Sequence, residues 1–132
     1  MDRSALTRIS ALVLVAMLLL AACGGGASVG GSATTGPAAL TALTRELDDA
    51  VARLKANDIP GAQAAFQRFQ AGWAAIEDGV KAKTKDGYAK IESGITDVQA
   101  VLTVPATPDP KKAIDALEQL DSVVDDVVAT LK

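Results

Sequence analysis

The sequence contains no histidine and a single cysteine, Cys23. It therefore lacks the side chains from which zinc sites, haem sites and most nucleophilic triads are built. It also lacks a glycine-rich phosphate loop followed by a basic residue. These absences argue against an enzyme. They leave carboxylates as the only plausible metal ligands, and carboxylates suit hard cations such as calcium, magnesium or ferric iron.

The chain has no excess of basic residues. Its 132 residues include 13 Lys and Arg against 16 Asp and Glu. When Asp2, Arg3 and Arg8 at the amino end are set aside, 11 basic and 15 acidic residues remain from Cys23 onward, a net charge of about −4. Binding to nucleic acid through phosphate contacts needs a basic face. We therefore expect no nucleic-acid partner.

One long apolar run is present, at the amino end of the chain. Ala11–Leu20 contains neither a charge nor a helix breaker, and Arg3 and Arg8 precede it. A pair of small alanines follows. These three zones predict a secretion signal over residues 1–22 that is removed from the mature protein. The run is shorter than the roughly 20 apolar residues that a permanent membrane helix needs.

The residues Leu20-Ala21-Ala22-Cys23 resemble the lipobox of bacterial lipoproteins. The resemblance implies that Cys23 carries acyl chains such as palmitate and becomes the new amino terminus. Each buried methylene then contributes about 0.8 kcal/mol to membrane affinity. The alternative is an ordinary cleaved signal in which Cys23 is incidental, but a lone cysteine in a secreted protein would otherwise have no disulfide partner. We expect a lipid anchor on the extracytoplasmic face of the cell membrane or outer membrane.

The next segment has almost nothing to bury. Residues 24–36 read GGGASVGGSATTG, a composition that predicts a flexible linker over residues 23–36 with an end-to-end distance of about 20 Å. Residues 37–132 then form a single domain in this interpretation, because roughly a hundred residues suffice for one small core.

Past Pro37 the apolar residues recur in steps of three and four, the spacing of amphipathic helices. Breaks at residues 57–60, 84–87 and 105–109 separate four such stripes, and Asp109-Pro110 supplies a cap and a first-turn proline. Short connections place neighbouring helices antiparallel, so the sequence predicts an all-α, up-down-up-down four-helix bundle. The stripes are Leu40, Leu43, Leu47, Val51 and Leu54; Ala62, Phe66, Phe69, Trp73, Ile76 and Val80; Tyr88, Ile91, Ile95, Val98 and Leu102; and Leu117, Leu120, Val124, Val127 and Leu131.

Two carboxylates are notable for their positions beside aromatic residues that we otherwise expect in the core. Glu77 follows Trp73 by four residues, and Glu92 follows Tyr88 by four. Each glutamate thus lies one helical turn beyond an aromatic residue, at the edge of an apolar stripe. If the hairpin folds about residues 83–86, Glu77 and Glu92 face one another at the same height, as in bundle carboxylate sites. Alternatively, both lie on solvated flanks with lysines as surface partners.

Further acidic residues predict solvated acidic faces on the first and fourth helices. They are Asp48 and Asp49 on the first helix, and Glu118, Asp121 and Asp125 on the fourth.

The run of residues 69–81, continued by residues 88–92, resembles the extracytoplasmic helical domain that accompanies the membrane part of some bacterial high-affinity iron permeases. The distinctive segments are W-x-x-x-E at Trp73–Glu77 and Y-x-x-I-E at Tyr88–Glu92. The chain has no permease helices and no R-E-x-x-E iron motif, and its nearest approach, Arg45–Asp49, ends in Asp. The resemblance implies a detached accessory module at the cell surface that binds or hands on iron or another hard cation, with a membrane permease as a candidate partner and Glu77 and Glu92 as the positions to test.

A second class of function stays open. In that class, the domain is a non-enzymatic structural or interaction module that docks through one bundle face on a membrane or envelope protein.

Overall fold

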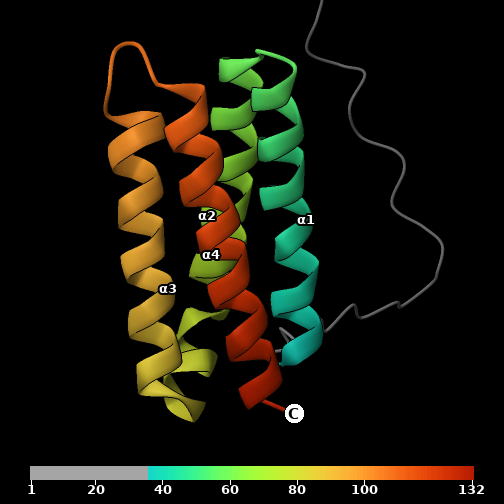
Figure 1. Cartoon of the computed structure of the whole chain (residues 1–132). Coiled ribbons are helices and arrows are strands. Elements are labelled where there is room, and N and C mark those ends of the chain that lie inside the picture. The colour runs from blue at the N-terminus through green and yellow to red at the C-terminus, as the bar shows by residue number, and fades with distance from the viewer. Residues whose placement is uncertain (1–35) are drawn as a thin grey trace, which may run out of the picture. The chain divides into compact units, whose positions relative to one another are not determined.

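The computed structural model describes residues 36–132, which form four long helices (Figure 1). The helices are α1 (Pro37–Lys55), α2 (Ile59–Lys83), α3 (Lys85–Val98) and α4 (Pro110–Thr130), and a short π-helix, η1 (Gln99–Thr103), continues α3. This part of the chain contains no strand. The predicted all-helical class and the four helices are therefore confirmed. The predicted signal, Cys23 and almost all of the linker lie outside the described residues.

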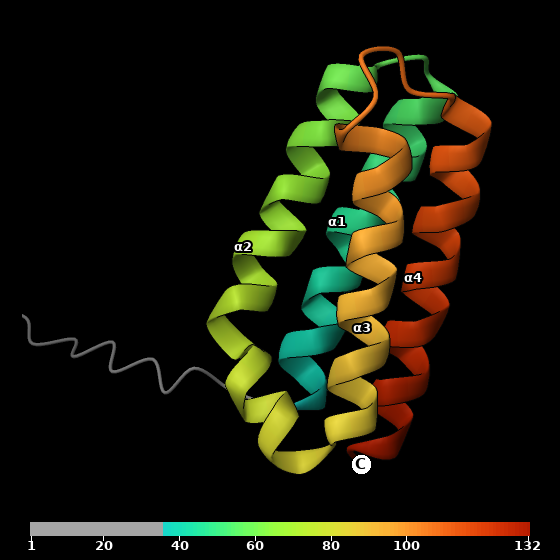
Figure 2. The same ribbon diagram turned by 90° about the vertical axis from the view of Figure 1, so that its left-hand side faces the viewer.

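The four helices lie side by side. α1 contacts α2 and α4, and α3 contacts α2 and α4. Figures 1 and 2 show the α2–α3 connection at the same end of the bundle as the start of α1 and the carboxyl terminus. We call this the Pro37 end. The α1–α2 connection and the α3–α4 loop lie at the other end, which we call the Val104 end. α1 has 19 residues. At a rise of about 1.5 Å per residue, the distance between the two ends is about 28 Å.

The core consists mainly of the four predicted apolar stripes. Phe66 and Phe69 are fully buried and lie parallel, with 6.1 Å between ring centroids. Trp73 is also buried, whereas Tyr88 is half-buried and packs at the edge of the core. The predicted core role of the aromatic residues is thus confirmed for three of them and holds in part for Tyr88. Burial of one phenylalanine side chain stabilises a fold by roughly 1.5–3 kcal/mol.

The α1–α2 connection reverses the chain with few residues. Asn57 adopts a left-handed conformation with φ of 60°, which asparagine tolerates better than most residues do. Asp58 then caps α2, because its carboxylate accepts a 2.9 Å hydrogen bond from the backbone N–H of Gly61. The predicted break over residues 57–60 is confirmed for residues 57 and 58, whereas Ile59 and Pro60 already form the first turn of α2.

The α2–α3 connection is shorter than predicted. Thr84 alone separates the two helices, and its hydroxyl accepts a 3.1 Å hydrogen bond from the N–H of Gly87. The prediction of a turn over residues 84–87 is therefore wrong for residues 85–87, which already form the first turn of α3. One capping threonine is sufficient because it ends α2 and begins α3.

The α3–α4 loop begins beyond η1. The side-chain amide of Gln63, on α2, donates a 2.8 Å hydrogen bond to the carbonyl oxygen of Leu102 in η1. Val104 follows η1 and is 77% exposed. As predicted, Asp109 caps α4 and accepts hydrogen bonds from the backbone N–H groups of Lys111 and Lys112.

None of the described helices combines the length and the apolar character that crossing a membrane requires.

Candidate functional site

Trp73, Tyr88 and Glu92 meet where α2 packs on α3. The ring of Trp73 stacks on that of Tyr88, with centroids 5.9 Å apart and planes inclined by 26°. The indole N–H of Trp73 donates a 2.5 Å hydrogen bond to Oε1 of Glu92. Hydrogen bonds to a charged acceptor contribute roughly 1.5–3 kcal/mol. The carboxylate of Glu92 therefore helps to hold α3 against the buried aromatic residue of α2.

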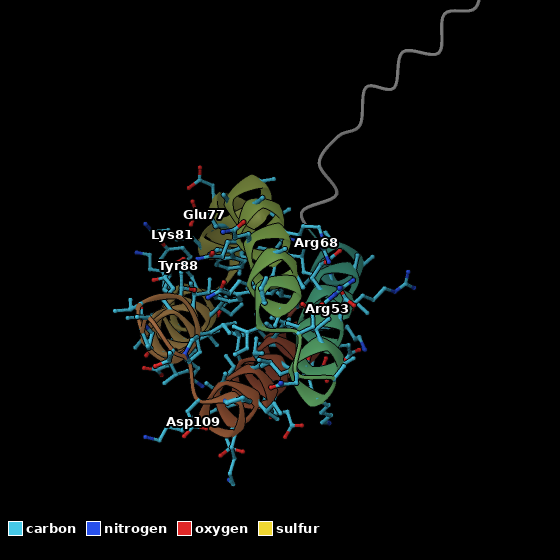
Figure 3. The ribbon with its side chains drawn as sticks, turned by 90° about the horizontal axis from the view of Figure 1, so that it is seen from above. Arg53, Arg68, Glu77, Lys81, Tyr88 and Asp109 are labelled. Atoms are coloured by element: carbon cyan, nitrogen blue, oxygen red, sulfur yellow. The ribbon has the colours of Figure 1, made fainter. Side chains whose placement is uncertain are left out.

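Lys81 and Glu77 lie on the same side of the bundle as this contact (Figure 3). The ammonium nitrogen of Lys81 lies 4.7 Å from the centroid of the Tyr88 ring, within the range of a cation–π interaction. Glu77 is half-buried, and no described residue forms a hydrogen bond or an ion pair with its carboxylate in the structure.

The contact made by Glu92 differs from the one expected from the sequence. Its hydrogen-bond partner is Trp73, one helical turn before Glu77 on α2. Among residues 36–132 there is no group of three or more acidic, histidine or cysteine side chains placed to share a metal ion. A cation site formed by Glu77 and Glu92 stays a prediction.

The acidic residues of α1 are largely engaged with arginines. Arg68 on α2 forms ion pairs with Glu46, at 2.7 Å, and with Asp49, at 2.8 Å. Asp49 also pairs with Arg53, which in turn pairs with Asp58. This arrangement corrects the expectation of a purely solvated acidic face at Asp49, because the residue lies at the junction of α1 and α2.

The same network shifts two pKa values. The N–H of Gly61 and then the guanidinium of Arg53 lower the pKa of Asp58, because both stabilise its charged form. Hydrogen bonds to Asp49 and Asp58 raise the pKa of Arg53.

Asp121 occupies a different environment, on the side of α4 that faces α1. Its Oδ1 atom is buried and has no hydrogen-bond partner in the described part of the chain. Burial raises the pKa of Asp121, and the neighbouring charges of Asp125 and Asp48 raise it further. The expectation that Asp121 belongs to a solvated acidic face is therefore wrong. Helical spacing places Asp121 beside the buried residues Leu117 and Val124, at the edge of the apolar stripe, but it does not show which oxygen is buried.

A groove with a volume of about 200 Å³ lies between α3 and α4. Gly94 contributes to its floor, since a Cβ atom at this position would lie 2.8 Å from Cδ1 of Leu120. The glycine thus lets α3 approach α4 closely. Sequence reasoning missed the groove, although a glycine inside a helix was the available signal. The lining residues are Lys90, Ser93, Gly94, Asp97, Ala116, Gln119, Leu120 and Val123.

No protein-family model, curated protein or solved structure matches this chain.

Proposed function

We propose that the chain is a bacterial lipoprotein of the cell envelope. Residues 1–22 direct its export, acylated Cys23 anchors it, and residues 37–132 form an up-down-up-down bundle on the extracytoplasmic face. The bundle acts without enzymatic activity, as a module that docks on a membrane or envelope protein. The lipobox resemblance supports the anchor, and contacts between helices adjacent in sequence support the alternating topology.

The observation that supports the docking role is that the carboxylates form hydrogen bonds and ion pairs with side chains of neighbouring helices. Glu92 accepts the indole N–H of Trp73, and Glu46 and Asp49 are paired with Arg68. A cation that recruited Glu92 would have to compete with a charge-assisted hydrogen bond to a buried donor. These carboxylates therefore serve to join helices. This role favours a rigid docking module and disfavours a module that exchanges cations.

A second candidate is an accessory to uptake that binds iron or another hard cation and delivers it to a membrane permease. The contact between Trp73 and Glu92 favours this candidate in one respect. It joins Glu92 to the side chain of Trp73, which precedes Glu77 by one helical turn on α2. Both glutamates are half-buried.

Trp73 provides the test that separates the two candidates, because it is the only tryptophan in the chain. A cation that binds Glu92 changes the charge of the carboxylate that accepts the indole N–H, and therefore changes the Trp73 fluorescence. It also raises the stability of the folded state by about 2.7 kcal/mol at a concentration 100 times the Kd. Ferric, calcium and manganese ions should be titrated while fluorescence and Tm are recorded.

The matched variants are Glu77→Gln with Glu92→Gln, and Asp78→Asn as an exposed control on the same helix. The cation candidate requires both responses in the wild-type protein and in the control, and their loss in the double variant. The docking candidate predicts that none of these ions changes the fluorescence or the Tm.

The anchor is tested separately with Cys23→Ala. We expect the wild-type protein to partition into detergent and its amino-terminal peptide to carry the mass of acyl chains, whereas the variant stays in the aqueous phase. An unmodified Cys23 in the mature wild-type protein would refute the lipoprotein assignment.

Docking through one face is tested by photo-crosslinking in intact cells. Gln119 lines the α3–α4 groove, and Gln67 is exposed on α2. A docking module gives a defined adduct from one of these positions and not from the other, and a metal chelator leaves the adduct unchanged. Identical adducts from both positions, or none from either, contradict docking through one of these two faces.

A further inference from the structure

Three lysines lie close together at the Pro37 end of the bundle. Lys81 and Lys83 belong to the last turn of α2, and Lys85 is the first residue of α3. All three are exposed. The only acidic residue within this connection is Asp86. The connection from Lys81 to Asp86 thus has a net charge of +2, whereas α4, which ends at the same end of the bundle, has Asp125 and Asp126 in its last turns and the chain as a whole has a net charge of −3.

These lysines contribute little to the fold through ion pairs. The ion pairs of the described residues involve Arg53, Lys55, Arg68 and Lys111 as the cations, whereas Lys81, Lys83 and Lys85 form none with a described residue. A cation at the start of a helix also interacts unfavourably with the helix dipole. Lys85 occupies such a position in α3. Its charge thus costs stability and receives no ion pair in return.

The α2–α3 connection, which carries the three lysines, lies at the end of the bundle where α1 begins (Figures 1 and 2). Cys23 precedes Pro37 by 14 residues. The linker predicted from the sequence of residues 23–36 has an expected end-to-end distance of about 20 Å. Covalent connection alone therefore keeps the Pro37 end close to the membrane in which the anchor is inserted.

We propose that the Pro37 end is a membrane-facing surface on which Lys81, Lys83 and Lys85 contact the anionic headgroups of the membrane that holds the Cys23 anchor. The inference rests on the proposed lipidation. Each lysine close to an anionic membrane increases the residence of this end at the surface about fivefold. The attraction decays over a Debye length of about 8 Å at physiological ionic strength, so it acts on this end alone.

The junction with the linker and the lysines of the α2–α3 connection lie at the same end of the bundle. The bundle therefore stands on the Pro37 end, with its Val104 end pointing away from the membrane.

The test uses the mature chain as it is isolated from cells, added to two kinds of vesicle, pure phosphatidylcholine and phosphatidylcholine containing phosphatidylglycerol. The rate of amine labelling at each lysine is read by mass spectrometry. We expect Lys83 and Lys85 to react about fivefold more slowly on the anionic vesicles, and about 0.5 M salt to remove the difference because it shortens the Debye length. Lys111 and Lys112 at the Val104 end provide the internal control and should react equally on both.

Charge reversal provides a second control. Lys83→Glu with Lys85→Glu should abolish the protection of Lys81 on anionic vesicles, whereas Lys111→Glu with Lys112→Glu should preserve it. All four positions are exposed and near a helix end, so both variants should keep the wild-type Tm within a few degrees. A chain that binds neither vesicle refutes the lipid anchor. A vesicle-bound chain whose lysines react equally on both lipids refutes the membrane-facing surface and leaves the anchor intact.

Discussion

The indole N–H of Trp73 donates to Oε1 of Glu92 at 2.5 Å, and this bond joins α2 to α3. Trp73 is only 3% exposed, so its N–H has little access to water. A buried donor that loses its partner costs roughly 1–3 kcal/mol. The packing of α3 on α2 therefore depends on one carboxylate at the edge of the core.

Removal of that carboxylate should be costly. We expect Glu92→Ala to lower the free energy of unfolding by about 2 kcal/mol, because it leaves the indole N–H unpaired. Glu77→Ala, one turn away from the contact on α2, should change the free energy by less than about 0.5 kcal/mol. Urea unfolding followed by circular dichroism measures both values. Equal losses in the two variants would show that the hydrogen bond does not form in solution.

Asp121 should make the bundle more stable as the pH falls through its raised folded-state pKa. Its folded-state pKa is raised above the ordinary value of 3.8, mainly by burial. The folded protein therefore binds this proton more tightly than the unfolded chain does, and stability rises as the pH falls through the folded pKa towards 3.8. Asp121→Asn should be more stable than the wild type at pH 7 and should lose this rise.

The pKa of Asp58 is shifted in the opposite direction, below its ordinary value of 3.8. Its contribution to stability is present above 3.8 and is lost as the pH falls through the lowered folded pKa. The two groups thus act in different pH windows. We expect acidification to stabilise the protein through Asp121 and to destabilise it through Asp58, and Asp121→Asn to lose the stabilising part. The same dependence of Tm on pH in the wild type and in Asp121→Asn would contradict the environment of Asp121.

Gln63 should stabilise the distorted end of α3. Its side-chain amide donates to the carbonyl oxygen of Leu102 in the π-helix. We expect Gln63→Leu to cost about 1 kcal/mol, the usual net contribution of one hydrogen bond. Gln67→Leu, an exposed position one turn further along α2, should be within about 0.5 kcal/mol of the wild type. Hydrogen exchange should also accelerate across residues 99–104 in the first variant and not in the second.

Thr84 should be sensitive to the loss of its hydroxyl group. Thr84→Ala removes the acceptor for the N–H of Gly87 and should cost about 1 kcal/mol. Thr84→Ser keeps an acceptor at the same place and should cost much less. Thermal unfolding of the two variants makes the comparison, and an equally destabilised serine variant would assign the effect to the threonine methyl group instead of the cap.

The helices and their caps were predictable from the sequence because they depend on local patterns. Leu47, Phe66 and Leu117 repeat at helical spacing and are buried, while Asp58 and Asp109 lie at cap positions that their side chains favour. The length of the α2–α3 connection was not predictable in the same way. Whether Lys85 begins a helix or ends a turn depends on the single cap supplied by Thr84.

The contacts between helices were less accessible to sequence reasoning. The partner of Glu92 depends on which rotamer the Trp73 ring adopts and on how far α3 is displaced along α2, and spacing within one helix fixes neither. Similarly, the acidic run on α1 gave no sign that Arg68 would bridge Glu46 and Asp49 across an interface. Geometry between elements, more than residue type, decides which carboxylates are available to a ligand.

The contact between α1 and α4 has a kinetic consequence. The other pairs of long helices in contact are neighbours in sequence, whereas α1 and α4 lie at the two ends of the described chain. Hairpin-like contacts between neighbours form early because they close short loops, and contacts between distant segments form late. We therefore expect the α1–α4 interface to complete last during folding and to open first during unfolding. The charges of Asp48 and Asp121 oppose one another across this interface, so acidification should slow unfolding more than it accelerates folding.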